Sequence, residues 1–145
     1  MEVKFLEPDQ LLSLFDEVVS DSLEICIASA FLNFAGLSLL EKYLKKHHYI
    51  KSIKILLDED FHPDIEIKKE LLHKLSGLPN TEVRLFSDKE KRFHAKIYFF
   101  KGVDKIEVVV GSSNLTGGGL LHNVEMNALF VTDINPTTIH MISSR

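Results

Sequence analysis

Two apolar runs, residues 93–100 and 105–111, constrain the fold of this chain more than any other feature. Both runs are rich in aromatic and β-branched residues, which favour strands over helices. Gly102 and Asp104 lie between the runs and supply the residue types that turns need. The segment therefore predicts a β-hairpin.

The register of this hairpin follows from the turn that joins its strands. If Lys101 pairs with Lys105 around a three-residue turn, His94 lies opposite Ser112; a slip of one or two residues stays open. A glycine triplet, residues 117–119, follows the second strand and lets the backbone approach a ligand closely. The hairpin is thus expected to bring its first and last residues to one edge of a sheet.

Polar residues occupy the start of the first strand and the end of the second. Alternation along a strand puts His94 and Lys96 on the same face. A buried lysine is costly unless it is paired or hydrogen-bonded, so Lys96 is expected to meet an anion or to open onto a cavity. Ser112 and Asn114 stand where the second strand ends, and Glu125 lies on a third apolar stretch.

These residues resemble the HKD motif of the phospholipase D superfamily, which reads HxK, a spacer, D, then GSxN or GGxN, and a later acidic residue. His94 and Lys96 match HxK, the residues GSSN at 111–114 match GSxN, and Glu125 is the acidic residue. Lys101 stands at the position of the motif's Asp. Branches that resemble restriction endonucleases and helicase-associated nucleases often lack that Asp.

Cleaving a phosphodiester without a metal needs a nucleophile, donors for the developing phosphoryl charge and an acid for the leaving alkoxide. His94 is the candidate nucleophile, forming a phosphohistidine, and Glu125 is the candidate carboxylate on its other ring nitrogen. Lys96 and Asn114 are expected to bind the non-bridging oxygens, with Ser112 as a supporting hydroxyl. Neither a metal nor a cofactor is expected.

The resemblance also predicts partners. Similar proteins use two HKD motifs, and the second histidine protonates the leaving group, whereas this chain holds one motif. We expect a homodimer with one composite active site, or else a fragment of a longer polypeptide that carries helicase or restriction-system domains. Residues 84–105 contain seven Lys or Arg against three Asp or Glu, a local basic excess in a chain of net charge −4.

The resulting hypothesis is a metal-independent DNA endonuclease. Two alternatives stay open at this point. A non-catalytic nucleic-acid-binding or dimerisation module is favoured by Lys101 at the Asp position, and a phospholipid phosphodiesterase is the third interpretation.

The fold class expected is mixed α/β, with a largely parallel sheet sandwiched between helices, a phospholipase D-like architecture. The 145 residues, 45% of them hydrophobic, fit one domain spanning 1–145. Cys26 is the only cysteine and lies in an apolar run, so no internal disulfide is expected. The N-terminus lacks signal-peptide features and no run of about 18 apolar residues occurs, which predicts a cytoplasmic protein without a membrane partner.

Periodicity predicts where the helices and strands lie. Helices are expected at 8–20, from about 37 to 48 and at 65–75, and strands at 23–31, 52–57 and 81–86, besides the hairpin.

Two other acidic patterns invite a metal interpretation. The segment PDIEIK, residues 63–68, imitates the signature of metal-dependent nucleases, but its acidic residues are too close together, and Asp64 fits the start of a helix better. Asp58, Asp60, His62 and Asp64 could together bind a divalent ion, although an exposed acidic loop is the simpler interpretation. A role for His122, near Glu125, stays open.

Overall fold

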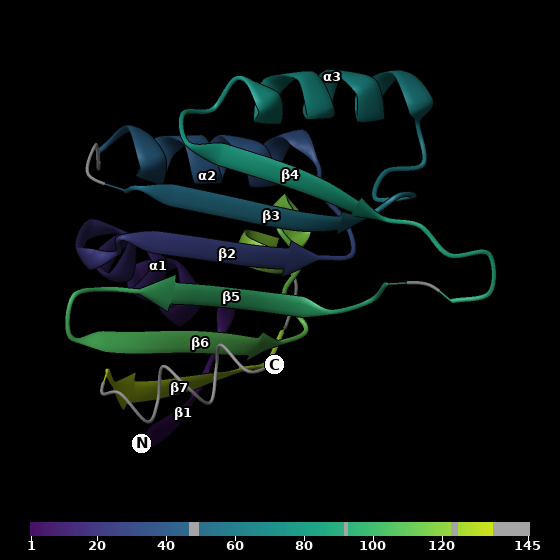
Figure 1. Ribbon diagram of the computed structural model, residues 1–145. Coiled ribbons are helices and arrows are strands. Elements are labelled where there is room, and N and C mark those ends of the chain that lie inside the picture. The colour runs from purple at the N-terminus through teal and green to yellow at the C-terminus, as the bar shows by residue number, and fades with distance from the viewer. Residues whose placement is uncertain (47–49, 92, 123–124, 135–145) are drawn as a thin grey trace.

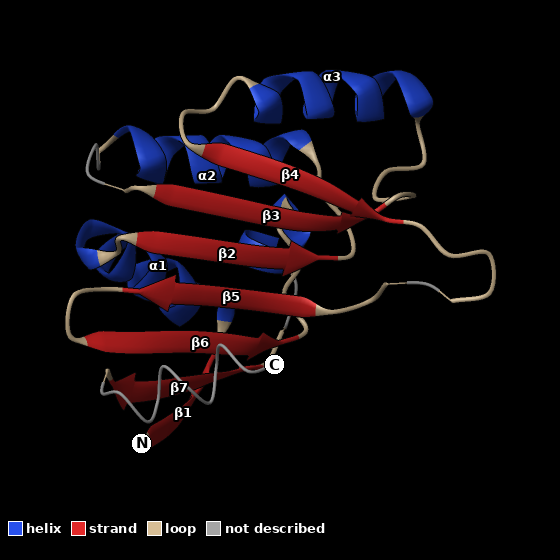
Figure 2. Ribbon diagram, viewed as in Figure 1, coloured by secondary structure: helices blue, strands red, loops and turns tan. Residues whose placement is uncertain are grey.

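The computed structural model describes residues 1–46, 50–91, 93–122 and 125–134. Alternating strands and helices make up its first half, and strands dominate the second (Figure 1, Figure 2). The elements are, in order, β1 (Glu2–Leu6), α1 (Pro8–Asp21), β2 (Glu24–Ser29), α2 (Phe34–Lys45), β3 (Ser52–Asp58), α3 (Ile65–Ser76), β4 (Thr81–Phe86), β5 (Lys96–Lys101), β6 (Lys105–Gly111), a short π-helical turn η1 (Gly118–His122) and β7 (Asn127–Asp133).

Seven strands form one sheet in the order β1-β7-β6-β5-β2-β3-β4. The mixed α/β class is confirmed, but the expectation of a largely parallel sheet is wrong. Among the described strands, only β2 with β3 and β3 with β4 pair in parallel, and α2 and α3 are the crossover helices that join them. The remaining four pairings are antiparallel.

Strand β1 was missed from the sequence, and it pairs antiparallel with β7 at the sheet edge. Its residues alternate in character, with Val3 and Phe5 between Glu2 and Lys4. The strand is five residues long and exposed along most of its length, so the apolar signal that marks a buried strand is weak there.

The hairpin between β5 and β6 is confirmed, but its register differs by one residue from the prediction. Lys101 pairs with Ile106, and the Gly102 N–H donates to the Lys105 carbonyl at 3.0 Å. The turn therefore contains two residues, Val103 and Asp104, rather than three. Gly102 and Asp104 suit turns of either length, so residue types alone did not decide between two and three turn residues.

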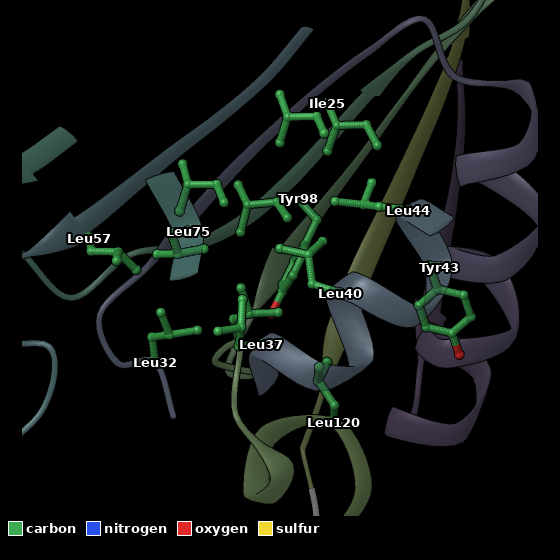
Figure 3. Close-up of a cluster of buried hydrophobic side chains, with 14 of the residues drawn as sticks. Ile25, Leu32, Leu37, Leu40, Tyr43, Leu44, Leu57, Leu75, Tyr98 and Leu120 are labelled. Atoms are coloured by element: carbon green, nitrogen blue, oxygen red, sulfur yellow. The ribbon is translucent and has the colours of Figure 1, made fainter. Parts of the chain in front are cut away.

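One apolar core lies between the helices and a single face of the sheet. Figure 3 shows α2 residues Leu37 and Leu40 beside Tyr98 of β5, and Ile25 of β2 belongs to the same buried cluster. Tyr98 and Ile25 are fully buried, which places the even-numbered residues of β5 on the helix-covered face. His94 and Lys96 have the same parity, so the site begins at the margin of the core.

The opposite face of the sheet is only partly covered by the described residues. The three α-helices lie together on the other face (Figure 1), so the expected sandwich between two helical layers is not seen within the described ranges. Cys26, Phe99 and Val108 are half-buried there, and Val110 is exposed. No described helix is long and apolar enough to cross a lipid bilayer.

The first turn of α2 packs against the segment that follows β6. Asn33 caps the helix by accepting a hydrogen bond from the Gly36 N–H at 2.9 Å, and its Oδ1 also accepts from the Gly117 N–H at 3.2 Å. A β-carbon on Gly36 would collide with the carbonyl of Leu115. Glycine is required here because helix and loop backbones touch.

We expect Gly36→Ala to destabilise the protein by ~1–3 kcal/mol, the usual cost of overpacking, since neither backbone can retreat easily. Gly77→Ala is the matched control. Gly77 follows α3 with φ −85°, and an added β-carbon would meet no atom closer than 3.5 Å. Urea unfolding monitored by circular dichroism measures both changes. A Gly36→Ala variant as stable as Gly77→Ala would contradict the close packing of α2 on this loop.

Candidate functional site

The motif residues gather at the edge where β2 ends and β5 begins. Ser29 and Lys96 are direct partners in the antiparallel pairing of these strands. Strands β2, β3 and β4 all end at this edge, on the right of Figure 1. The carboxyl ends of parallel strands are the usual place for a ligand site in an α/β sheet.

His94 is exposed and lies two residues before β5, where its ring contacts the lysine of the motif. The Lys96 Nζ lies 2.6 Å from Nδ1 of His94 and donates to the His94 carbonyl oxygen at 2.9 Å. An ammonium has only donors, so this contact requires an unprotonated Nδ1. Phe31 meets the imidazole edge to face, with ring centroids 6.3 Å apart and planes at 89°.

Two opposing effects act on Lys96. Burial disfavours its charged form and lowers its pKa, whereas the negative charge of Glu125 raises the pKa and offsets part of that change. The net pKa lies below the ordinary lysine value. Glu125 is half-buried, and its negative charge acts on Lys96. Its predicted contact with a nitrogen of His94 stays a prediction.

Asn114 is held by residues from the end of β2. Its Oδ1 accepts a hydrogen bond from the Phe31 N–H at 3.3 Å and lies 3.3 Å from Oγ of Ser29. The next amide, Leu115 N–H, donates to the same Ser29 hydroxyl at 2.9 Å. A β-carbon on Gly119 would collide with the backbone of Asn114, so this member of the glycine triplet allows the chain to pass close to the site.

The neighbouring serines have structural partners. The Tyr98 hydroxyl donates to the Ser113 carbonyl at 2.9 Å, and burial raises the pKa of Tyr98, which keeps it a neutral donor. The Ser112 hydroxyl accepts from the Met126 N–H at 3.0 Å and lies 3.3 Å from the Met126 carbonyl. If Ser112 binds phosphate as predicted, its hydroxyl must contact the phosphate as well as the backbone of Met126.

The acidic loop binds backbone amides. Asp58 is buried and accepts hydrogen bonds from the Asp60 N–H at 2.9 Å and the Phe93 N–H at 3.0 Å, which anchors the residue before His94. Asp64 caps α3, as the helix-start interpretation predicted. Among the described residues, no group of three or more His, Cys, Asp or Glu side chains gathers closely enough to hold a metal ion.

Lys101, at the motif's Asp position, lies at the far end of β5 from His94. Its Nζ is 3.5 Å from a carboxylate oxygen of Glu24, its partner on β2. Lys101 lies five residue steps after Lys96 along the strand, a distance of roughly 17 Å at about 3.3 Å per step. Lys101 therefore makes a strand contact away from the other motif residues.

Three positioning groups were not found from the sequence: Ser29, the Phe31 backbone and Asp58. The only available signal was a polar residue at the end of each of two apolar strands, Ser29 on β2 and Asp58 on β3. The side chain of His122, and residues 123–124 beside it, lie outside the described residues.

We expect Glu125→Gln to lower the pKa of Lys96 further. The carboxylate favours the ammonium form, so its removal lets Lys96 lose its proton at a lower pH. Carbon-13 NMR titration of the Lys96 Cε measures the change. Glu24→Gln removes the same charge from the other end of the β2–β5 pair and is expected to leave the pKa of Lys96 in place. A pKa that rises in Glu125→Gln would contradict the described geometry.

The family was established by comparison with known proteins. A family model described as "Cardiolipin synthase, PLD-like domain" matches residues 20–140. No curated protein sequence matches the chain.

Solved structures of low sequence identity share the fold. NucT from Helicobacter pylori superposes with a TM-score of 0.67 at 17% identity, over 99% of this chain and 91% of that chain. Nuc from Salmonella typhimurium, a phospholipase D family member, gives 0.64 at 17% identity, over 99% and 89%. A yeast tyrosyl-DNA phosphodiesterase gives 0.59 at 12% identity, over 92% and 33%. With the family model matching most of its length, the chain belongs to the phospholipase D-like domain family.

Proposed function

We propose that the protein is a phosphodiesterase, and more specifically a metal-independent DNA endonuclease that acts through a phosphohistidine. The contact that carries this proposal is the pairing of Lys96 with His94, 2.6 Å from Nζ to Nδ1, at the sheet edge that also holds Asn114. A nucleophilic nitrogen and a cation side by side are what phosphoryl transfer without a metal requires.

In the first step an unprotonated ring nitrogen of His94 attacks phosphorus. A P–N bond forms as the P–O bond to the leaving group breaks, and the leaving oxygen takes a proton from an acid. Lys96 exchanges its contacts to His94 for a non-bridging oxygen, and the Asn114 amide donates to the same phosphoryl group. Water then attacks phosphorus and gives its proton to the group that acted as the acid, while the P–N bond breaks and the neutral imidazole is regenerated.

The acid is proposed to come from a second copy of the chain. The sequence contains one HxK pattern, at His94 to Lys96, so the second motif histidine that would act as the acid is sought on another chain. Two copies related by a two-fold axis would place one His94 on each side of the scissile bond and form one composite site. Exposed apolar side chains near this edge, Val110 and Met126, are proposed to lie at the rim of the interface.

Two observations favour DNA as the proposed substrate. Residues 84–105, which include His94 and Lys96, carry an excess of basic side chains. Two proteins of similar fold also have descriptions that mention DNA. These are the tyrosyl-DNA phosphodiesterase and TrmBL2, an archaeal chromatin protein with a novel mode of DNA binding, which superposes at TM-score 0.54 and 16% identity. TrmBL2 also supports the alternative of a non-catalytic DNA-binding module. The family description supports lipid phosphodiester chemistry as a third candidate.

We expect the purified protein to cleave plasmid DNA in excess EDTA, and His94→Ala to abolish cleavage, because the nucleophile and the cation are side chains. His73→Ala, an exposed histidine in the last turn of α3, is the control for loss of an imidazole. Cleavage that stops on chelation and returns with magnesium would contradict the mechanism. Folded protein that binds DNA without cleaving it would favour the binding module, and turnover of phospholipid alone would favour the lipid enzyme.

A second control compares two lysines of one strand. Lys96→Ala is expected to cost roughly 2.7–4 kcal/mol of transition-state stabilisation, the range seen when one oxyanion donor is lost. Lys101→Ala removes the same charge at the far end of β5 and is expected to retain activity. Equal losses in the two variants would point to general charge attraction rather than to a site at Lys96.

We expect a composite dimer site to make His94→Ala dominant. Inactive chains added in large excess exchange into mixed dimers that lack one imidazole, so the activity per wild-type chain falls roughly with the fraction of wild-type chains. An equal excess of Lys101→Ala is the control, because its mixed dimers keep both imidazoles. Wild-type activity that survives the His94→Ala excess, together with a monomer in sedimentation velocity, would contradict the dimer proposal.

A further inference from the structure

We propose that Ser29, a residue of β2 outside the motif, is a positioning residue that orients the side-chain amide of Asn114 for phosphate binding. This inference rests on the proposed function, because Asn114 is the amide donor of that site. Ser29 is fully buried, and its side chain lies on the core face of the sheet beside Lys96, its strand partner.

Three polar groups surround the Ser29 hydroxyl. The Leu115 N–H lies 2.9 Å from Oγ, the Phe31 carbonyl 2.7 Å and Oδ1 of Asn114 3.3 Å. A buried hydroxyl is stable only with such partners, so their number and closeness indicate a fixed rotamer.

The roles of these partners follow from their chemistry. A backbone N–H can only donate, so Leu115 occupies a lone pair of the Ser29 oxygen. The hydroxyl has one proton, and the shorter contact favours donation to the Phe31 carbonyl over the longer one to Asn114. The Ser29 hydroxyl therefore links the backbone carbonyl of Phe31 to the backbone N–H of Leu115 by hydrogen bonds, directly beside the side-chain amide of Asn114.

The orientation of the Asn114 amide follows from a second donor. The Phe31 N–H points at this side chain at 3.3 Å, and a donor requires an acceptor, so the amide oxygen must face β2. The amide is planar, which directs its NH2 group away from Ser29 and Phe31. The NH2 group is then the one presented to a phosphoryl oxygen, which needs donors.

The surrounding contacts persist without the Ser29 hydroxyl. Leu32 and Leu115 form an isolated parallel β-bridge, and Asn33 accepts a hydrogen bond from the Gly117 N–H at 3.2 Å. These contacts hold the loop after β6 against the start of α2. Removing the hydroxyl is therefore expected to loosen the Asn114 amide while the fold stays intact.

The test is a double-mutant cycle on kcat/KM for DNA cleavage. Ser29→Ala is expected to lower kcat/KM roughly 10- to 100-fold, mainly through kcat, as for a donor held out of position. If Ser29 acts through Asn114, the double variant Ser29→Ala with Asn114→Ala is no worse than Asn114→Ala alone. Losses that multiply, or wild-type kcat/KM in folded Ser29→Ala, would overturn the proposal.

Ser22→Ala is the matched control, because Ser22 is equally buried but precedes β2 at the other end of the sheet. It is expected to keep the wild-type kcat/KM after correction for the folded fraction.

Should Ser29→Ala not fold, Ser29→Cys keeps a group of similar size with weaker hydrogen bonds. A smaller loss in the same direction would support the proposal, and wild-type kcat/KM would overturn it.

A readout without turnover separates this inference from the proposed function. The side-chain NH2 signals of Asn114 in a nitrogen-15 spectrum are identified by their loss in Asn114→Ala. They are expected to shift in Ser29→Ala and to stay in place in Ser22→Ala. Unshifted signals in Ser29→Ala would overturn the role of Ser29, whereas a shift in a protein that does not cleave DNA would leave that role standing and reject the nuclease.

Discussion

The antiparallel pairing of β2 with β5 is the contact on which the rest of the structure depends. It joins the parallel part of the sheet, built by β2, β3 and β4, to the antiparallel part formed by β5, β6, β7 and β1. It also sets Ser29 against Lys96, so the end of one half of the sheet meets the start of the other. The histidine, the lysine and the residues that hold Asn114 share one edge because of this pairing.

Local sequence signals predicted most of the elements. Helix α3 begins at the Asp64 cap and ends before Gly77, and β4 matches its predicted bounds, because these limits depend on nearby residues. The order and direction of the strands depend on contacts between distant segments. Strand β1, the two-residue turn of the hairpin and the mainly antiparallel pairing were accordingly missed.

The candidate site follows the same division between local and distant signals. The motif spacing singled out His94, Lys96 and Asn114 as candidates. The structure brings the first two into contact and holds the third beside the end of β2, and their catalytic roles stay a prediction. The groups that hold them are Ser29 at the end of β2, the backbone of Phe31 just after it and Asp58 at the end of β3. These groups are far from the motif in sequence, so no motif spacing reveals them. Burial of Lys96, which lowers its pKa, likewise depends on how β5 meets the core.

The most direct test of the account is to trap the covalent intermediate. A cleavage reaction is quenched in denaturant at alkaline pH, where phosphohistidine survives, and the protein is then digested with trypsin. Trypsin cuts after Arg92 and after Lys96, so it releases Phe93–Lys96 as a four-residue peptide. Mass spectrometry is predicted to find this peptide carrying a nucleotidyl phosphate, lost in His94→Ala. Rapid turnover without that adduct, or with the phosphate on another residue, would contradict the assignment of His94 as the nucleophile.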